Sequence, residues 1–320
     1  MSWRPLASMH TLRLRAELLA ATRAFFAERG VLEVDTPALV RHAVTDPHLH
    51  SAEVHLPGYP QTLYLHTSPE FAMKRLLAAG SGDICQIAHV YRGEEFGRLH
   101  NAEFTLIEWY RCGYSMSALM DEVAQLTQRL LAVSPVLPVE SLSYSQAIER
   151  ATGCEPLGAT ESQLRRVAIE QGLELRLAAR CQRDELLDWL MAGVVGPRLG
   201  AGTLCFVHGY PATQAALARL DPDDARIARR FELYHRGVEL ANGFEELTDA
   251  AEQRARFEAD REQRRQRQLP LPAIDPALLE ALESGLPPVA GVALGFDRVL
   301  MLRTGADEIG AVLPFPLTRA

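Results

Sequence analysis

The stretch that decides the fold runs from Tyr91 to Tyr110 and reads Tyr-Arg-Gly-Glu-Glu-Phe-Gly-Arg-Leu-His-Asn-Ala-Glu-Phe-Thr-Leu-Ile-Glu-Trp-Tyr. Apolar residues lead in, a polar segment with a glycine follows at Glu95–Arg98, and an alternating run comes last. This pattern predicts two strands joined by a turn. Side chains alternate along a strand, so one face of the second strand is expected to carry four residues. They are Phe104, Leu106, Glu108 and Tyr110.

This strand face mixes aromatic rings, a carboxylate and a phenol. Glu108 is out of place on a face used only for packing, because a buried carboxylate is costly unless it meets a cation or hydrogen-bond donors. Arg92 and Glu94 stand two residues apart and are expected on a shared face. An arginine suits phosphate oxygens, a carboxylate accepts from an amine, and Phe104 can stack on a base. These are contacts that a nucleotide offers.

Composition bounds the class of protein. The chain has 320 residues and a formal net charge of −8. It contains no run of about 18 apolar residues, the length that spans a bilayer, and its first residues show no secretory signal. Five scattered cysteines without a Cys-x-x-Cys pair favour a reducing cytosol over a disulfide framework. The acidic balance argues against a broad nucleic-acid-binding surface.

Two segments before Tyr91 have clear local patterns. An apolar stripe predicts a helix over His10–Arg29, followed by a strand from Val31 that ends at Pro37. Further on, a strand ending in Ser68-Pro69-Glu70 leads into a helix over Phe71–Ala79. Glu70 then lies in the first helical turn, where its carboxylate either caps the helix or binds a substrate ammonium.

The middle of the chain predicts helices without evident chemistry. They cover Ser117–Val133, Thr160–Gln171 and Arg183–Val195, and the second begins with a capping box of Thr160 and Gln163. A charged helix is expected over Ala250–Gln268, with Arg254 and Glu258 at i,i+4 spacing and its arginines on a solvated face.

The segment from Phe231 to Asp249 is the other chemical stretch. Two extended runs carry Glu232 and Glu239, whose oxygens suit Mg²⁺ between triphosphate oxygens. Asn242 and Glu246 follow among apolar residues, which is unlike a solvated acidic turn.

The pattern Arg-x-Glu, a short loop, His-Asn-x-Glu-Phe-Thr and Glu-x-Tyr resembles motif 2 of the class II aminoacyl-tRNA synthetases in its lysyl version. His10–Pro37 resembles motif 1, which forms the dimer interface in that family, and Gly291–Leu300 resembles motif 3. The resemblance implies an α+β fold, with an antiparallel sheet flanked by helices. It implies a single catalytic domain over residues 1–320, with a helical insertion at about 115–200 and no anticodon-binding domain.

A catalytic domain without a tRNA-reading module is similar to the elongation factor P (R)-β-lysine ligases. The segments Thr45–Leu49 and Ser68-Pro69-Glu70, and the run Gly-Val-Ala-Leu-Gly around Ala293, resemble that family as well. Two positions depart from its motif 2, namely Gly93, where Asn is common, and Ala102, where Pro is common.

The resemblance also implies the site residues. Arg92 and Arg298 are the catalytic pair, and Glu232 and Glu239 are the metal ligands. The implied ATP-binding residues are Arg92, Gly93, Glu94, His100, Asn101, Phe104, Glu239, Leu240, Gly295 and Arg298. The implied substrate-binding residues are Ser68, Pro69, Glu70, Glu108, Tyr110, Asn242, Glu246 and Ala293.

The implied activity is that of a cytoplasmic, homodimeric ligase using ATP and Mg²⁺. It activates (R)-β-lysine as an adenylate, releases pyrophosphate and transfers the β-lysyl group to a lysine ε-amine of elongation factor P. A shortened enzyme that charges tRNA is the main alternative, and tRNA binding would decide it. An inactive regulatory paralogue and a ligase for small molecules also stay open, although the Arg and Glu set is intact.

Overall fold

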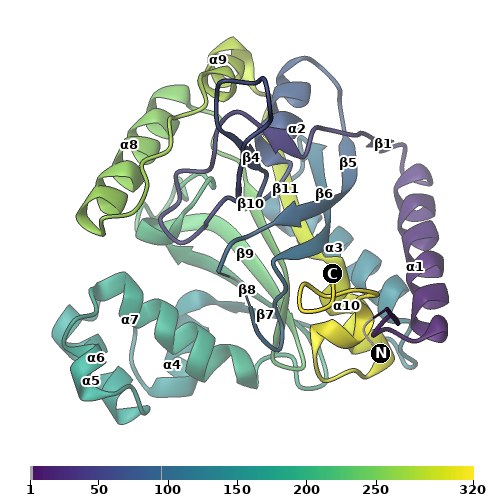
Figure 1. Cartoon of the computed structure of the whole chain (residues 1–320). Helices are drawn as coiled ribbons and strands as arrows, with labels where there is room; N and C mark the ends of the chain where they lie inside the picture. Colours follow the sequence, from purple (N-terminus) through teal and green to yellow (C-terminus); the bar gives the residue numbers. More distant parts are fainter. Residues whose placement is uncertain (1–2, 95) are drawn as a thin grey trace. The chain divides into compact units, whose positions relative to one another are not determined.

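The computed structural model describes residues 3–94 and 96–320. The chain divides into two compact units (Figure 1). The first comprises the residues up to Ser115, Gln125–Ala132 and Leu247–Ala320, and the second comprises Met116–Ala124 and Val133–Glu246. Helix α3 (Met116–Leu131) supplies residues to both units.

The sheet of the first unit is built around the predicted hairpin, whose two strands are confirmed. Glu95, the first residue of the expected turn, lies outside the described residues. Strands β5 (Ile84–Tyr91) and β6 (Glu103–Cys112) pair antiparallel, and β11 (Val289–Gly295) pairs antiparallel with β6. The short β1 (Leu32–Glu33) adds a parallel edge to β5. The expected fold class, a largely antiparallel sheet flanked by helices, is therefore correct.

Helices flank this sheet, three of them where the sequence predicts helices, over His10–Arg29, Phe71–Ala79 and Ala250–Gln268. The flanking helices are α1 (Met9–Ala27), α2 (Glu70–Ala78), α8 (Ala250–Gln266), α9 (Pro276–Gly285) and α10 (Phe296–Thr304), with a short 3₁₀ turn η4 (Ile309–Val312). Helix α1 buries Phe26 against Trp109 of β6, with ring centroids 5.2 Å apart. A small sheet of β2 (Leu39–Val40), β4 (Leu63–Leu65) and β3 (Glu53–Val54) completes the unit.

The second unit contains a sheet in the order β10-β9-β8-β7. Its strands are β7 (Val139–Ser143), β8 (Leu204–Pro211), β9 (Ile227–His235) and β10 (Val238–Glu245). β8, β9 and β10 are antiparallel, whereas β7 lies parallel to β8. The β9–β10 hairpin carries the acidic residues singled out in the sequence.

Short helices bury a common apolar core in the second unit. They are α4 (Tyr144–Thr152), α5 (Glu161–Glu170), α6 (Leu175–Ala178), α7 (Arg183–Leu190) and the turn η1 (Met191–Val195). Two 3₁₀ turns, η2 (Gly196–Arg198) and η3 (Ala212–Gln214), lie outside this core. The capping box of Thr160 and Gln163 is confirmed. The helix expected over 183–195 continues beyond Leu190 as a π-helical turn. The boundaries of the inserted helices within one catalytic domain stay a prediction.

Three local expectations are wrong. Glu94 does not continue the strand beside Arg92, because β5 ends at Tyr91 and Glu94 has a left-handed φ of 65°. Arg254 forms its ion pair with Glu283 of α9, at 3.7 Å, rather than with Glu258. Arg264 is 4% exposed instead of solvated.

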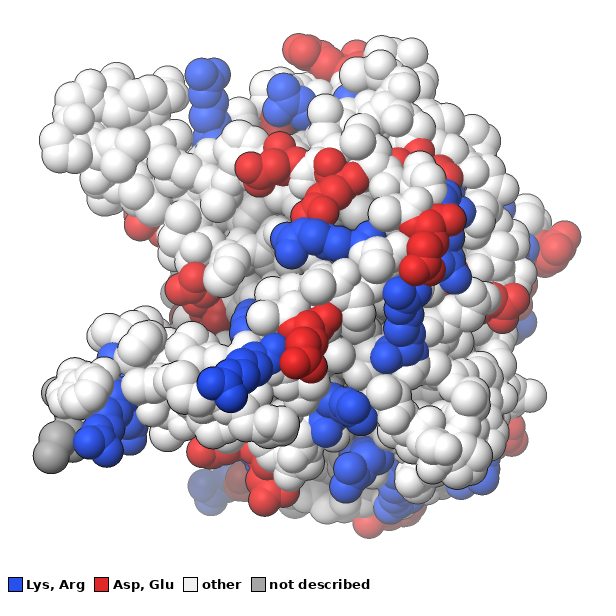
Figure 2. Space-filling model, turned by 90° about the vertical axis from the view of Figure 1, so that its right-hand side faces the viewer, with Lys and Arg blue, Asp and Glu red and all other residues white. Residues whose placement is uncertain are grey.

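Acidic and basic side chains both occur on the surface of the protein. Figure 2 shows acidic and basic side chains interspersed over the face that it displays. Within residues 3–94 and 96–320, no helix has the length and apolarity needed to cross a membrane.

Candidate active site

The register of the first sheet makes a floor of small residues around Leu106, and Glu108 adjoins this floor. Glu108 of β6 lies opposite Ala293 of β11, and Leu106 lies opposite Ala88 of β5 and Gly295 of β11. Directly opposite residues point to the same face of a sheet. Small residues therefore flank Leu106 on both sides, whereas Glu108 has Ala293 on one side and the larger Gln86 of β5 on the other.

Glu108 is an enclosed carboxylate beside this floor, with 2% of its surface exposed. The hydroxyl of Ser68 donates to its Oε2 at 2.7 Å, and the phenol of Tyr110 donates to its Oε1 at 2.8 Å. Burial first, and then the charge of Glu70, raise the pKa of Glu108 to about 7, although both hydrogen bonds oppose that rise. A cation arriving beside Glu108 would favour its ionised form.

Glu70 begins α2, as the sequence predicts. Its backbone N–H donates to the Ser68 hydroxyl at 3.0 Å, so Ser68 links the Glu108 carboxylate to the backbone of Glu70 at the start of α2. Pro69 lies between Ser68 and Glu70 in the chain. The Nζ atom of Lys74 lies 2.7 Å from Glu70 Oε1. Sequence reasoning overlooked Lys74, although its i,i+4 spacing from Glu70 was a usable signal.

The loop after β5 holds the first group of expected ATP ligands. Arg92 donates from Nε to the Thr67 carbonyl at 3.3 Å, and its guanidinium lies 5.1 Å from the centre of the Phe104 ring. Gly93 donates its N–H to the His50 carbonyl at 2.7 Å. A Cβ atom at Gly93 would lie 3.2 Å from the Cβ of His50 and 3.3 Å from its carbonyl oxygen, so a larger residue here would require a small shift of His50. Glu94 Oε2 lies 3.5 Å from His50 Nε2.

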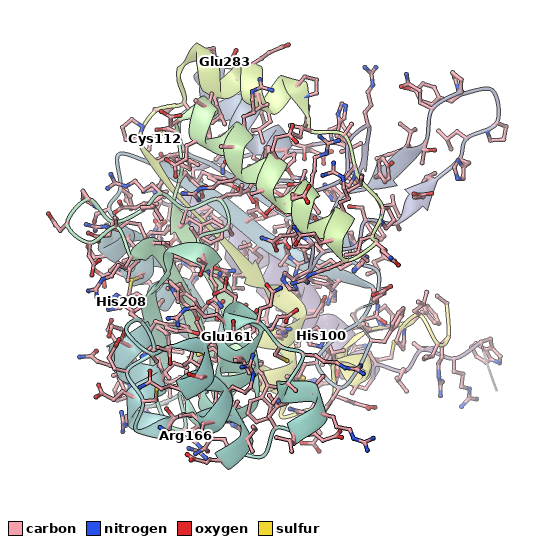
Figure 3. The ribbon with its side chains drawn as sticks, turned by 90° about the vertical axis from the view of Figure 1, so that its left-hand side faces the viewer. His100, Cys112, Glu161, Arg166, His208 and Glu283 are labelled. Carbon is pink, nitrogen blue, oxygen red and sulfur yellow. The ribbon has the colours of Figure 1, made fainter. Side chains whose placement is uncertain are left out.

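A second group of expected ATP ligands gathers where α10 meets the hairpin loop. Arg298 Nη2 lies 2.8 Å from Nε2 of His100, which is labelled in Figure 3, and Arg298 Nε donates to the Leu99 carbonyl at 3.4 Å. Asn101 donates from Nδ2 to the Glu103 carbonyl at 2.7 Å and accepts from the Leu317 N–H at 3.1 Å. The structure thus brings Arg298, His100 and Asn101 together.

Asp297 and Arg15 tie three separate segments together, and sequence reasoning missed both. Asp297 is 1% exposed, and its Oδ2 accepts the Thr105 N–H at 2.7 Å. Its other oxygen pairs with Arg15 of α1, which also donates to the Thr105 hydroxyl at 2.6 Å. The position of Arg298 on α10 is therefore fixed to α1 and β6 through its neighbour in the chain.

Arg264 of α8 holds the loop that precedes His50. Its guanidinium donates to the backbone carbonyls of Thr45 at 2.8 Å, Asp46 at 2.7 Å, Leu49 at 2.7 Å and Pro270 at 3.1 Å. Because His50 binds Gly93, this buried arginine supports the loop of Arg92 and Glu94 from behind.

In the second unit, Glu232 is surrounded by donors. Its Oε2 accepts from the phenols of Tyr210 at 2.5 Å and Tyr234 at 2.6 Å, and its Oε1 accepts from Arg230 at 2.6 Å. Burial, followed by the charge of Glu232, raises the pKa values of both phenols well above their usual range. Glu232 is thereby held as a fixed carboxylate, with a lone pair left on Oε1.

A bulge in β10 brings the other polar residues onto the face of Glu232. Asn242 lies opposite Glu232, and Glu239 lies opposite Tyr234, with an irregularity between Glu239 and Ala241. Leu240 is the extra residue and is 2% exposed. Without a bulge, Glu239 and Asn242 would point to opposite faces, because their separation of three is odd.

The structure places Glu246 directly after β10. It forms an isolated bridge with Ala218 and is 3% exposed. Asn242 Oδ1 is buried and has no hydrogen-bond partner among the described residues. A buried amide oxygen without a partner indicates that a ligand or water supplies the missing contact.

A family model described as tRNA synthetases class II (D, K and N) matches residues 1–319. The chain belongs to this class II synthetase family. Curated relatives named elongation factor P (R)-β-lysine ligase match its full length. Those of Klebsiella pneumoniae (strain 342) and Edwardsiella ictaluri (strain 93-146) are 49% identical over 323 residues, and that of Salmonella agona (strain SL483) is 48% identical. Each match covers 100% of this chain and 98% of the relative. The resemblance read from the motifs is confirmed.

As a class II synthetase, the chain is expected to bind a divalent cation with triphosphate. Across the described ranges, no three His, Cys, Asp or Glu side chains cluster as a complete metal cage. Mg²⁺ does not require one, because it usually takes one or two carboxylates and completes its shell with water and phosphate oxygens. Glu232 and Glu239 offer hard oxygen donors on one strand face, so the donor set fits.

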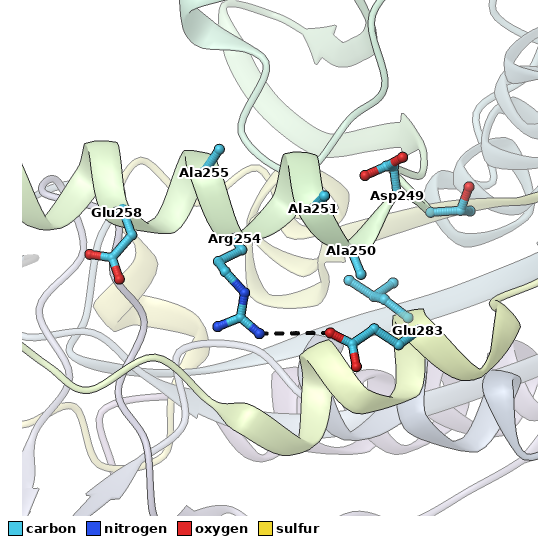
Figure 4. Close-up of a pocket in the computed structure, with 9 residues that line it drawn as sticks. Asp249, Ala250, Ala251, Arg254, Ala255, Glu258 and Glu283 are labelled. Atoms are coloured by element: carbon cyan, nitrogen blue, oxygen red, sulfur yellow. Dashed lines mark ion pairs between the residues drawn. The ribbon is translucent and has the colours of Figure 1, made fainter.

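A hollow of about 690 Å³ lies elsewhere on this synthetase chain, between α8 and α9 (Figure 4). Its lining comes from Thr248, Asp249, Ala250, Ala251, Arg254, Ala255, Glu258, Leu282 and Glu283. The predicted site residues are not among them.

Proposed function

We propose that the chain is a ligase that activates (R)-β-lysine with ATP and joins it to a lysine ε-amine of elongation factor P. The names of full-length relatives at 48–49% identity support the substrate and the acceptor. The class II synthetase family supports the use of ATP. The observation that carries the proposal is the enclosed Glu108, held by Ser68 and Tyr110 beside a floor of small residues. This arrangement suits an ammonium group that must leave water.

In the activation step, the substrate carboxylate attacks the α-phosphorus of ATP. A new oxygen–phosphorus bond forms, and pyrophosphate leaves with the electrons of the broken bond. Arg92 binds the α-phosphate and Arg298 the far phosphates, so that charge is stabilised where it develops. Phe104 stacks on adenine and Glu94 accepts from its amine. Gly93, His100, Asn101, Leu240 and Gly295 complete the contacts to ATP.

Glu232 and Glu239 would hold Mg²⁺, which supplies positive charge to the phosphate oxygens when bound. This chain's own contribution is to fix both carboxylates. Tyr210, Tyr234 and Arg230 hold Glu232, and the bulge at Leu240 orients Glu239.

The diamino substrate needs a carboxylate for each ammonium group, since an unpaired buried charge is costly. Glu246, with Asn242, binds the far ammonium. The set of Ser68, Pro69, Glu70, Glu108 and Tyr110 faces the other. Ala293, opposite Glu108, limits the space at that end.

In the transfer step, the ε-amine of the acceptor lysine attacks the activated carbonyl carbon. An amide bond forms, the bond from carbonyl carbon to phosphate oxygen breaks, and AMP leaves. The phosphate takes up the proton that the amine loses.

We also propose that the chain acts in the cytoplasm as a homodimer through the His10–Pro37 region. Its cysteine usage supports the compartment, and exposed apolar residues of that region and its immediate flank support the interface. Met9 is 58% exposed and Leu32 is 55% exposed. Exposed apolar residues of this kind can be buried against a second copy of the chain across a two-fold axis. A monomeric mass in light scattering at micromolar concentration would contradict the dimer.

The decisive experiment follows the intact mass of elongation factor P incubated with enzyme, ATP and (R)-β-lysine. A gain of one β-lysyl group is expected, together with pyrophosphate exchange in the absence of tRNA. Arg298→Ala should lower the exchange rate by about 10²-fold, as for other donors that stabilise transition-state charge. Charging of tRNA without modification of elongation factor P would establish the alternative function.

A further inference from the structure

Lys74 has no role in the reaction proposed above, yet it lies beside the carboxylates that have one. It is the only lysine in a chain whose 33 lysines and arginines are otherwise all Arg. It is also 1% exposed, with its Nζ 2.7 Å from Glu70 Oε1. A buried ammonium is costly unless it meets a partner, so its place in the core calls for a reason.

Hydrogen bonds join Lys74 to Glu108 through two intermediate residues. Glu70, which pairs with Lys74, donates its N–H to Ser68, and Ser68 donates its hydroxyl to Glu108. The groups that act on Glu108 come from the start of α2 and from its own strand. They are Glu70, Ser68, Tyr110 and Lys74.

The charges of this cluster can be counted. With Lys74 protonated and both carboxylates ionised, the sum is −1. Without Lys74 it would be −2 in a buried space, and two like charges there push one carboxyl to hold its proton. A carboxyl that holds its proton cannot pair with an ammonium group. The charge of Lys74 therefore favours the ionised form of Glu108.

We propose that Lys74 is a positioning residue that neutralises Glu70 and thereby leaves Glu108 to take up one ammonium group of the diamino substrate. The identity of that substrate rests on the proposed function. Glu70 keeps its second oxygen for substrate contact, while its charge is balanced within α2. The electrostatics of Glu108 support this role. Burial, and then the charge of Glu70, raise the pKa of Glu108 to about 7, whereas the charge of Lys74 lowers that pKa. Binding of the ammonium then releases the proton of Glu108.

The first test needs no substrate. The titration of Glu108 is followed in the whole enzyme by the infrared band of its carboxylic acid, assigned by its loss in Glu108→Gln. Lys74→Met should move the midpoint up by about one pH unit or more, because it leaves two like charges. Lys74→Arg should keep it in place. Arg75→Met, which removes the exposed cation next to Lys74, is the matched control and should leave it unchanged.

The substitution Glu70→Gln separates the effect of charge on the titration midpoint of Glu108 from the effect of side-chain shape. Alone it should lower the midpoint of Glu108, because it removes a neighbouring negative charge. The double variant Lys74→Met with Glu70→Gln restores the sum of −1 and should return the midpoint toward that of the wild type. If Lys74→Met does not fold, the fall in Glu70→Gln still tests the idea. A midpoint that stays unchanged in Glu70→Gln, or a double variant that behaves like Lys74→Met, would overturn it.

The second test uses calorimetry with (R)-β-lysine in two buffers of different ionisation heat. At pH 7 the wild type should release about half a proton on binding, because a carboxyl with a pKa near 7 is half protonated there. Lys74→Met should release more, and Lys74→Arg should match the wild type. Equal proton release in all three would contradict the role of Lys74. Absence of (R)-β-lysine binding to the wild type would instead refute the proposed function, while the infrared result would still decide the role of Lys74.

Discussion

Asp297 offers a clean test of how the site is held, because its partner Arg15 lies on a different helix. Asp297→Asn keeps the size of the side chain and an acceptor for the Thr105 N–H, but it removes the negative charge opposite Arg15. Asp297 is 1% exposed and the Arg15 side chain 15%. The substitution therefore leaves a guanidinium largely out of water without its counter-charge.

The expected loss follows from that burial. Breaking a buried ion pair by removing one partner costs about 3–5 kcal/mol. The amide introduced by Asp297→Asn would retain the backbone hydrogen bond, so a loss of about 3 kcal/mol is expected, a large share of the roughly 5–15 kcal/mol that stabilises a typical domain. Helix α1 supplies a matched control in Arg23, whose pair with Glu33 at 2.9 Å has side chains 52% and 43% exposed. Glu33→Gln should cost about 0–1 kcal/mol.

Denaturant unfolding of the two variants and the wild type gives the comparison. Asp297→Asn should also slow pyrophosphate exchange, because Arg298 follows it on α10. Glu33→Gln should leave the exchange rate unchanged. Equal unfolding midpoints for Asp297→Asn and Glu33→Gln would refute the reasoning. They would mean that burial does not increase the contribution of the Asp297–Arg15 ion pair to the free energy of unfolding.

Three further predictions concern substrate selection and the loop supports. Ala293→Gly combined with Ser68→Ala should shift the kcat/KM ratio of α-lysine to β-lysine by about 10- to 200-fold, since one methyl or one hydroxyl is worth that much; an unchanged ratio places selectivity elsewhere. Glu246→Gln should weaken diamino acid binding in calorimetry while ATP affinity stays close to that of the wild type; an equal fall in ATP affinity would make Glu246 a metal ligand. Arg264→Leu should lower the unfolding midpoint and raise the KM for ATP, whereas Arg267→Leu, at the exposed C-terminal end of α8, should change neither.

Local patterns were enough to predict the elements that carry the site. The alternation from Phe104 to Tyr110 predicted β6, and the strand ending in Ser68-Pro69-Glu70 predicted that Glu70 lies in the first turn of α2. Both signals lie within a few residues of the chain, where backbone geometry fixes which side chains meet. The resemblance to the synthetase motifs added site residues from two distant segments, Phe231–Asp249 and Gly291–Leu300. The roles of those residues stay predictions.

Local sequence patterns did not predict the register of the β9–β10 hairpin. Strict alternation places Glu239 and Asn242 on opposite faces, and only the extra residue at Leu240 brings them to one face. No particular residue type marks a bulge of this kind, so a single sequence does not indicate where the extra residue lies. The burial of Arg264 was missed for a related reason. Its acceptors are backbone carbonyls, which every residue has.

Three of the functional charges that the motifs identify have structural partners that the motifs do not. Glu232 is held by Arg230, Glu70 by Lys74, and the helix of Arg298 by the pair of Asp297 and Arg15. A charged side chain that must reorganise when the ligand binds stabilises the transition state less than one that is already in place. Fixing each charge against an opposite one keeps it in place before the ligand arrives, and it also keeps the local sum of charge small enough to bury. The partners therefore belong to the chemistry as much as the residues that touch the substrate, and substitution of Arg230, Lys74 or Arg15 should impair the reaction although none of them is expected to contact a reacting atom.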